Sequence, residues 1–314
     1  MKPDDGYISY IVNPSSGASS SRVISKQFKE YLFSKGFDVR ISQTNSLQHA
    51  CELATDAAVD FHCAMVVVAG GDGTVREVAH GLEGSDKPLL IVACGTENLL
   101  ANELGFDEKL NTLIKTFEEG NIRPLDLGNV NGKCFTSVAG FGFDGDVVKR
   151  FSAQRKGHTC HMDYFWPIWR SFWNYKFPVM QVRIDDEDVF EGRGMVFVGN
   201  ISRYALGLGI LRYADFGDGL LDVCIYKCES KLRLVKHSIF TIFKLHSEGK
   251  DVIYRRGKHI IVNSHEAGVA SEIDGDPGPG LPVDIKVIPQ AVNCVVLKGA
   301  KPAGMRIRII RAIG

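Results

Sequence analysis

The sequence lacks the features of several protein classes. No apolar run approaches the roughly 18 residues of a membrane-spanning helix, and the opening MKPDDGYISYIVNP lacks the apolar core of a secretory signal. The 8 cysteines form no CxxC pair and no zinc-finger spacing. Lysine plus arginine (37) equals aspartate plus glutamate (37), without the positive surplus of most nucleic-acid-binding proteins. We therefore expect a cytoplasmic protein with reduced thiols and no nucleic-acid partner.

The composition is that of a folded chain with room for two domains. Its 314 residues are 45% hydrophobic and 24% charged, which is typical of globular proteins. The run CAMVVVA at 63–69 has no polar alternation, which indicates a strand covered on both faces, as in a parallel sheet. Residues 1–125 alternate strands with helices and predict a three-layer α/β domain. The predicted strands cover 7–13, 37–42, 63–69 and 89–93, and the predicted helices 23–36, 47–58, 75–82, 99–104 and 110–119.

Residues 126–300 show a different pattern, with short apolar segments separated by glycine, proline and aspartate. They predict a β-rich, sandwich-like domain interrupted by two helices, 164–175 and 232–246. The predicted strands cover 134–139, 179–185, 194–199, 221–226, 260–263, 283–288 and 292–297. Residues 301–314 form a basic tail in which MRIRIIR is either a frayed end or a contact for anionic lipid.

The most informative segment is Gly70-Gly71-Asp72-Gly73-Thr74, between a buried strand and an amphipathic helix. Successive glycines allow a ligand to approach the backbone, and the first amides of the helix favour an anion such as phosphate. A carboxylate repels phosphate unless a cation lies between them, so Asp72 indicates a magnesium ion.

Two further loops have similar chemistry. Asn13-Pro14-Ser15-Ser16-Gly17 follows the first strand and Gly95-Thr96-Glu97-Asn98 follows the fourth, while Thr44 lies just past the second. Each loop alone could be a capped helix start. Because the carboxyl ends of parallel strands share one edge, we expect these loops to converge there on a ligand.

The ordered motifs resemble one family. NPSSG, AGGDGTVREVAHGL and GTENLLANELG, followed by GFGFD at 140–144, DGLLDV at 218–223 and DGD at 274–276, resemble the diacylglycerol kinase catalytic domain family. That family includes bacterial soluble diacylglycerol kinases, related lipid kinases, and sphingosine and ceramide kinases. The resemblance extends to about residue 297 and implies an NAD kinase/diacylglycerol kinase-like fold and an ATP-dependent lipid kinase. Since GGDGT also occurs in NAD kinases, an NAD kinase-like enzyme is one alternative, and a catalytically silent nucleotide- or lipid-binding regulator is another.

The resemblance also implies a set of site residues. Asp72 would organise Mg²⁺, and a second, structural Mg²⁺ would be held by Asp215, Asp218 and Leu220, although this segment also reads as an ordinary acidic turn. The residues implied to bind ATP are Asn13, Pro14, Ser15, Ser16, Gly17, Thr44, Gly70, Gly71, Gly73, Thr74, Glu77, Gly95, Thr96 and Asn98.

The chain departs from the family pattern at two positions. The family's general base is the glutamate of DGE, which here is Asp276, and Asp274 is the alternative base. An aspartate is one methylene shorter, so either the loop moves inward or a water intervenes. At Arg76 the family commonly has asparagine, and the arginine either adds charge to the phosphate site or pairs with Glu77.

Two other motifs suggest different chemistry. Gly140 to Gly145 matches GxGxxG, but no second βαβ unit supports a dinucleotide site. His158, Cys160 and His161 are too closely spaced for ordinary tetrahedral zinc ligation, so we interpret them as a polar loop.

The acceptor is suggested by a segment with all 3 tryptophans, Trp166, Trp169 and Trp173. Such a stripe is either part of a core or a surface that rests on lipid headgroups beside basic residues such as Arg170 and Lys176. We expect a peripheral membrane association and a lipid acceptor. Diacylglycerol is the first candidate, before a sphingoid base, ceramide or phosphatidylglycerol. The sequence leaves the oligomeric state open, a homodimer included.

Overall fold

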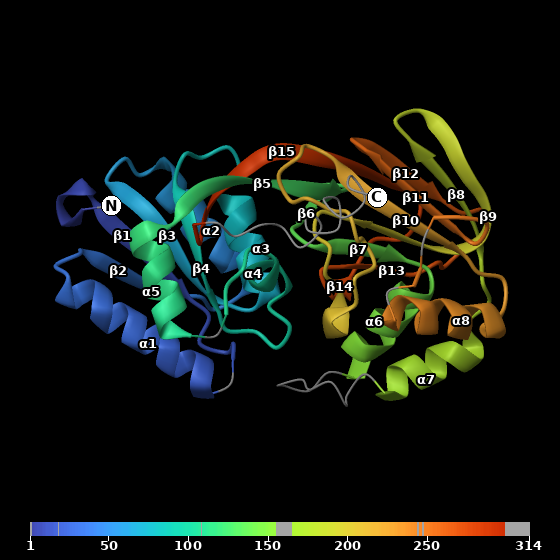
Figure 1. The fold of residues 1–314 in the computed structure, drawn as a ribbon, viewed down its shortest axis with the longest axis horizontal. Coiled ribbons are helices and arrows are strands. Elements are labelled where there is room, and N and C mark those ends of the chain that lie inside the picture. The colour runs from blue at the N-terminus through green and yellow to red at the C-terminus, as the bar shows by residue number, and fades with distance from the viewer. Residues whose placement is uncertain are drawn as a thin grey trace. The chain divides into compact units, whose positions relative to one another are not determined.

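The computed structural model describes residues 2–17, 19–107, 109–154, 165–243, 245–246 and 248–298. The tail 301–314 and the group His158, Cys160 and His161 lie outside these described residues. The chain divides into two compact units (Figure 1). Unit 1 contains the described residues of Met1–Leu127, Phe216–Asp218 and Ile288–Arg306, and unit 2 contains those of Gly128–Asp215 and Gly219–Val287.

Unit 1 is built on a parallel sheet with the strand order β2–β1–β3–β4. Each strand and helix predicted in residues 1–125 is present. The strands are β1 (Tyr7–Val12), β2 (Val39–Gln43), β3 (Cys63–Gly70) and β4 (Pro88–Ala93). The helices are the short 3-10 helix η1 (Pro3–Asp5), α1 (Ser19–Ser34), α2 (Leu47–Val59), α3 (Asp72–Gly81), α4 (Leu99–Glu103) and α5 (Leu110–Glu119).

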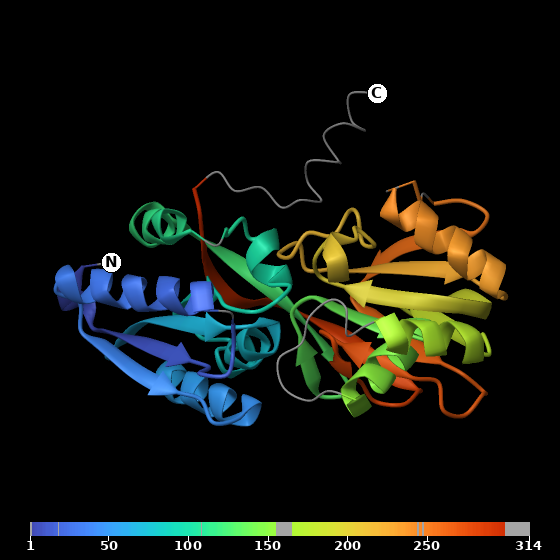
Figure 2. The same cartoon turned by 90° about the horizontal axis from the view of Figure 1, so that it is seen from below.

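Helices cover both faces of this sheet, which confirms the three-layer prediction (Figure 2). On one face the ring of Phe28 in α1 packs 6.5 Å from that of Tyr10 in β1. On the other face α2 buries three alanines at helical spacing and packs against α3. A Cβ on Gly81 of α3 would lie 2.4 Å from the carbonyl oxygen of Cys51 in α2. Only glycine therefore permits this close approach of the two helices.

The structure departs from the prediction at two long strands. β15 (Val283–Val296) is continuous where the sequence predicts two strands, because Gln290 (φ 51°) forms a local irregularity without ending the strand. Its residues near Asn293 pair in parallel with β4. β5 (Asn121–Val130) is missing from the prediction because Asp126 interrupts its apolar pattern. Asp126 is fully buried and accepts a hydrogen bond from the Gln290 amide at 2.7 Å.

Unit 2 is a sandwich of two antiparallel sheets, as predicted. One sheet has the order β9–β8–β12–β15, and the other β14–β13–β7–β9–β10–β11. β9 belongs to both, since residues 187–193 pair with β8 and residues 194–199 pair with β7 and β10. The strands are β6 (Lys133–Phe135), β7 (Val138–Phe141), β8 (Val179–Ile184), β9 (Glu187–Gly199), β10 (Leu221–Lys227), β11 (Val252–Gly257), β12 (His259–Asn263), β13 (Ser271–Ile273) and β14 (Asp276–Pro277).

The core of unit 2 lies between these sheets, where Phe141, Ile225, Met180 and Ile260 are fully buried. The outer face of the β7–β9–β10 sheet is covered by α6 (Phe143–Gln154), α7 (Phe165–Asn174), α8 (Lys231–Ile242) and the segment with the 3-10 helix η3 (Ala205–Gly207). No helix among the described residues is both long and apolar enough to span a bilayer.

Candidate active site

The predicted phosphate loops of unit 1 converge at the carboxyl edge of its sheet. The amide of Asn13 donates to the Ala69 carbonyl at 2.9 Å, and the amide of Cys94 donates to the Gly70 carbonyl at 2.9 Å. The Thr44 amide donates to the Val12 carbonyl at 2.8 Å. These backbone bonds bring four strand ends to one edge, as expected for a parallel sheet.

Two glycines form the centre of this edge. A Cβ on Gly95 would lie 2.8 Å from the Cα of Gly71 and 2.8 Å from Oδ1 of Asn98. A Cβ on Gly71 would lie 3.2 Å from the Cα of Gly95. The two backbones therefore approach as closely as they do only because both residues lack a side chain. Gly17 (φ 87°) is equally restricted, since its Cβ would lie 2.6 Å from the Cys94 carbonyl oxygen.

Side-chain hydrogen bonds hold the three loops in place. Asn13 donates from Nδ2 to Oγ1 of Thr74 at 2.8 Å, which ties the first loop to α3. The amide of Gly71 donates to Oγ of Ser16 at 3.4 Å. Asn98, buried and with φ 49°, accepts from the Gly95 amide at 2.6 Å and donates to the Gly95 carbonyl at 3.1 Å. The polar groups of the edge are therefore oriented before any ligand arrives.

The remaining predicted residues lie in the same loops. Pro14 and Ser15 are exposed, with the Ser15 amide bonded to Oδ1 of Asn13 at 2.9 Å. Thr96 is exposed and Thr44 is buried. Gly73 lies in the first turn of α3.

Asp72 occupies the first position of α3, directly after the N-cap residue Gly71. Glycine has no side chain to accept from the first amides of a helix, and the positive end of the helix dipole lies here. The arrangement suits an anion, and the Asp72 carboxylate beside it suits a cation bound to that anion.

Arg76 lies on the buried side of α3 and pairs with Glu77. Its Nε and one terminal nitrogen donate to Oε1 of Glu77 at 3.0 and 2.9 Å, and its side chain is only 3% exposed. Of the two roles expected for this arginine, the structure shows the pairing with Glu77. The departure from the family pattern at Arg76 is therefore accommodated by an ion pair within α3.

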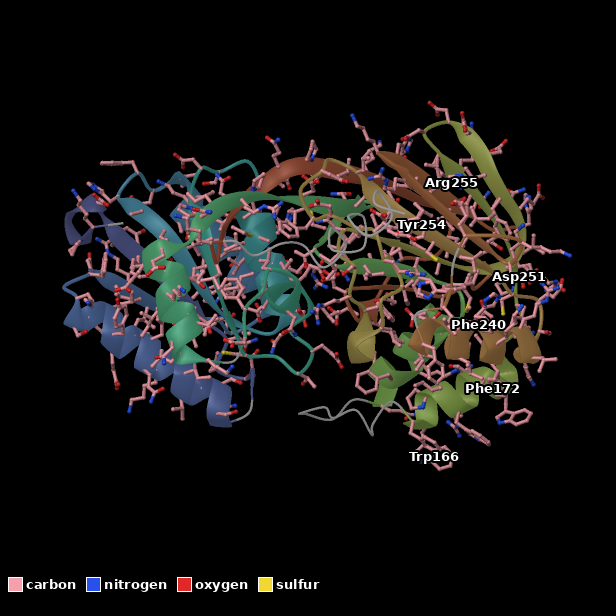
Figure 3. The ribbon with its side chains drawn as sticks, viewed as in Figure 1. Trp166, Phe172, Phe240, Asp251, Tyr254 and Arg255 are labelled. Carbon is pink, nitrogen blue, oxygen red and sulfur yellow. The ribbon has the colours of Figure 1, made fainter. Side chains whose placement is uncertain are left out.

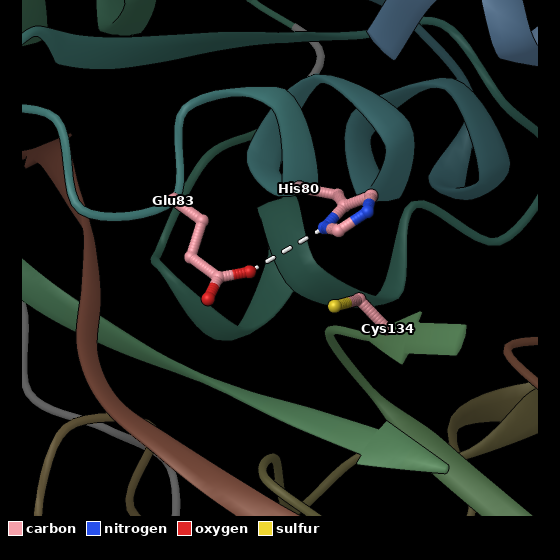
Figure 4. Close-up of side chains that lie close together, drawn as sticks. All are labelled: His80, Glu83 and Cys134. Carbon is pink, nitrogen blue, oxygen red and sulfur yellow. Dashed lines mark ion pairs between the residues drawn. The ribbon is translucent and has the colours of Figure 1, made fainter. Parts of the chain in front are cut away.

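Farther along the same helix, Nδ1 of His80 lies 3.5 Å from Oε2 of Glu83 (Figure 4). Both side chains are partly exposed at the helix end. Neither unit alone contains, among its described residues, three histidine, cysteine or carboxylate ligand atoms close enough to share a metal ion.

In unit 2, Asp274 has a structural position. Its carboxylate accepts from the amides of Thr136, Ser137 and Val138 at 2.9, 2.9 and 3.0 Å. Asp274 (φ 48°) thereby fixes the turn that leads to Asp276, the first residue of β14. These bonds engage both oxygens of Asp274, whereas Asp276 is partly buried; the assignment of the base to Asp276, with Asp274 as the alternative, stays a prediction.

Beside this turn lies a buried acid pair that the sequence interpretation missed. Oδ2 of Asp144 and Oε1 of Glu272 both lie within 3 Å of the position of a Cβ on Gly140. Oε2 of Glu272 accepts from the Gly275 amide at 2.8 Å, and Tyr204 donates to Asp144. Burial, and then the charge of Asp144, raises the pKa of Glu272 well above its usual range. Burial raises the pKa of Asp144 as well, so the two carboxyls retain a proton as a pair.

A signal for this pair was present in the sequence. Glu272 lies two positions before Asp274, and Asp144 ends the GFGFD motif. Gly145, the last glycine of the GxGxxG match, serves packing, because a Cβ there would lie 2.4 Å from the Ala270 backbone. This packing supports the interpretation that the GxGxxG match is no dinucleotide site.

The predicted structural magnesium segment is divided between the units. Asp215 and Leu220 belong to unit 2, whereas Asp218 belongs to unit 1. Asp215 is buried, and Gly217 packs so closely on Pro124 within unit 1 that a Cβ would lie 2.6 Å from its carbonyl oxygen. This metal site stays a prediction.

The anchoring role of Asp274 can be tested by unfolding in urea. Asp274→Ala leaves three buried amides without an acceptor and should lower the free energy of unfolding by about 2–4 kcal/mol. Asp188→Ala is the control, because Asp188 forms only a surface ion pair with Arg183 and should change stability by less than about 1 kcal/mol. Equal losses in the two variants would contradict the role.

The acid pair predicts how stability depends on pH. An ordinary glutamate has a pKa of about 4.3, so above that pH the unfolded chain releases a proton that folded Glu272 retains. The free energy of unfolding should therefore decrease as pH rises toward the raised pKa. Glu272→Gln, which has no titratable proton, should flatten this decrease in urea unfolding measured from about pH 5 to pH 9. Parallel curves for the two proteins would refute the shared proton.

Two models of known protein families match this chain, one in its first part and one in its second. The model for the diacylglycerol kinase catalytic domain matches residues 8–130. The model for the YegS C-terminal NAD kinase beta sandwich-like domain matches residues 137–296.

Relatives match over nearly their whole length. A diacylglycerol kinase of Mycobacterium tuberculosis (strain H37Rv) is 30% identical over 297 residues, covering 92% of this chain and 94% of the relative. One of Bacillus subtilis (strain 168) is 25% identical over 293 residues, covering 92% and 95%. The crystal structure of a diacylglycerol kinase of Bacillus anthracis str. Sterne has the same fold, with a TM-score of 0.71 at 19% identity over 94% of this chain and 98% of the other. The chain, with its parallel α/β unit and its β-sandwich, belongs to the diacylglycerol kinase catalytic domain family.

Proposed function

We propose that this lipid kinase family member transfers the γ-phosphoryl group of ATP to the hydroxyl of diacylglycerol in a magnesium-dependent reaction. The observation that carries the proposal is the contact between Gly71 and Gly95 at the start of α3, which presents backbone amides at a sheet edge. A sphingoid base, ceramide and phosphatidylglycerol are the next candidate acceptors after diacylglycerol. The proposal is supported by the sequence identity of this chain to two proteins named diacylglycerol kinase, 30% and 25%.

The nucleotide would bind through its phosphates. The amides that begin α3 and the hydroxyls of Ser16 and Thr74 offer donors of the kind that phosphates accept. No side chain at Gly71 or Gly95 excludes the phosphates from this backbone. Magnesium would neutralise phosphate charge beside Asp72, which lies at the same helix start. Its carboxylate supplies the oxygen ligands that this hard cation prefers.

Asp276 would accept the proton of the acceptor hydroxyl. Asp274 and Glu272 fix both sides of its turn through four backbone hydrogen bonds. A turn held in this way does not shift inward easily, so of the two alternatives for the shorter aspartate we favour a bridging water.

The proposed acceptors reside in membranes, so we propose that the enzyme acts from the cytoplasm as a peripheral membrane protein. We propose no nucleic-acid partner for this reaction, and a homodimer is compatible with it.

The reaction can be tested by transfer of labelled γ-phosphate from ATP to a panel of lipids in mixed micelles with Mg²⁺, with NAD as a soluble acceptor. We expect labelled diacylglycerol. Asp72→Asn and Asp276→Asn should each lower kcat by about 100-fold or more, while Asp276→Glu should stay within about tenfold of the wild type.

The surface variant Asp188→Asn is the matched control and should leave kcat unchanged, because its ion pair with Arg183 is exposed. Labelled NADP instead of labelled lipid would establish the NAD kinase-like alternative. ATP binding without transfer to any acceptor would establish the silent regulator.

The glycine contact can be tested separately from catalysis. Gly95→Ala adds a Cβ 2.8 Å from the Gly71 Cα, which forces the phosphate loops apart and should raise the Kd for Mg²⁺·ATP at least tenfold, or about 1.4 kcal/mol. Gly209→Ala is the control, since nothing lies within 4 Å of its Cβ position. Isothermal titration calorimetry would measure both. An unchanged Kd in folded Gly95→Ala would refute the proposed phosphate site.

A further inference from the structure

Helices α7 and α8 of unit 2 each bury one side and expose the other. On the buried side, Phe172 of α7 and Leu234 of α8 pack against the outer face of the β7–β9–β10 sheet. On the exposed side lie large apolar residues, 5 on α7 and 7 between residues 232 and 245, against 7 in all the other described residues together. Such a concentration is typical of an interaction surface.

The aromatic residues of α7 form a continuous exposed row. Phe165 stacks on Trp169 with ring centroids 6.4 Å apart, and Trp169 contacts Trp173 at 5.7 Å. Trp166 is 62% exposed and points away from the sheet (Figure 3). The tryptophan stripe is therefore not part of the core, which was the first of its two sequence interpretations.

α8 continues this surface, although the sequence interpretation did not include it. Nζ of Lys231, at the start of α8, lies 4.7 Å from the centre of the Trp173 ring at the end of α7. Leu232 of α8 is 81% exposed, and Phe243, which directly follows this helix, is 67% exposed. We call the exposed side chains of 165–173, 231–243 and 245 the α7/α8 surface.

The charge of the α7/α8 surface has one sign. Neither helix contains an acidic residue, while Arg170, Lys231, Arg233 and Lys236 are basic. Two acidic groups nearby, Glu229 and Asp251, pair with Arg233 and Lys236. A net positive charge remains, together with exposed indole rings, and this combination complements an anionic lipid surface.

We propose that the α7/α8 surface docks unit 2 onto anionic bilayers, with the aromatic row in the headgroup layer and the basic side chains on lipid phosphates. The proposal rests on the proposed function, because a lipid kinase must reach an acceptor in a membrane. α6 connects the surface to the acceptor side of the site, since it packs against α7 and against β13 and β14, which flank the turn before Asp276.

The chain offers a built-in reporter for this surface. All 3 tryptophans lie on α7, so tryptophan emission monitors this face alone. With full-length protein and vesicles of phosphatidylcholine and phosphatidylglycerol, we expect a blue shift and quenching by brominated lipid. Vesicles of phosphatidylcholine alone should bind at least tenfold more weakly, because several basic side chains lose their anionic partners.

Two variants and one control make the test specific. Leu232→Ser with Phe243→Ser keeps the tryptophan reporter and should weaken vesicle binding at least tenfold, as should Arg170→Glu with Lys231→Glu. Phe33→Ala with Phe61→Ala removes exposed aromatics of unit 1 and should leave binding unchanged. Circular dichroism confirms folding, and sedimentation velocity gives the oligomeric state.

The outcomes separate this proposal from the proposed function. Binding is measured without ATP, so vesicle binding lost in both variants supports the surface even if no lipid is phosphorylated. Activity on a water-soluble short-chain diacylglycerol should survive in both variants, while activity on vesicle diacylglycerol falls at least tenfold. Unchanged tryptophan emission with vesicles, or variants that alter only a dimer equilibrium, would overturn the surface as a membrane site.

Discussion

The close approach of Gly71 to Gly95 is the constraint on which the phosphate site of this protein depends. The loops after β1, β3 and β4 meet because neither glycine has a side chain, and Asn13, Ser16 and Asn98 then tie the three loops together. Helix α3 starts at this junction without a side-chain cap. The backbone amides and Asp72 are thus held in place by packing rather than by a ligand, which reduces the ordering that binding would require.

A second constraint acts in unit 2. Asp274 satisfies the amides of Thr136 to Val138, and Glu272 satisfies that of Gly275, so the turn before Asp276 is held from two sides. Glu272 can lie fully buried beside Asp144 only because the pair retains a proton. The turn that carries the proposed base is therefore held by two other carboxylates.

Much of this could be predicted from the sequence, for identifiable physical reasons. A fully apolar strand such as Cys63–Gly70 followed by GGDGT specifies a buried parallel strand and a helix start, so unit 1 and its converging loops could be predicted. β5 escaped prediction because the buried Asp126 resembles a loop residue, and its partner across the fold is 164 residues away in sequence. The acid pair escaped for a similar reason, since Glu272 and Asp144 become neighbours only through the pairing of β13 with β7. The exposure of the tryptophan row was undetermined, because helical spacing alone does not reveal which face packs.

The most direct test of the account is a crystal structure with Mg²⁺ and a non-hydrolysable ATP analogue. The account predicts phosphate oxygens on the backbone amides at Gly71 to Gly73, with the metal ion between the phosphates and Asp72. Phosphates bound away from the Gly71–Gly95 contact, or an Asp72 that faces neither metal nor phosphate, would contradict it.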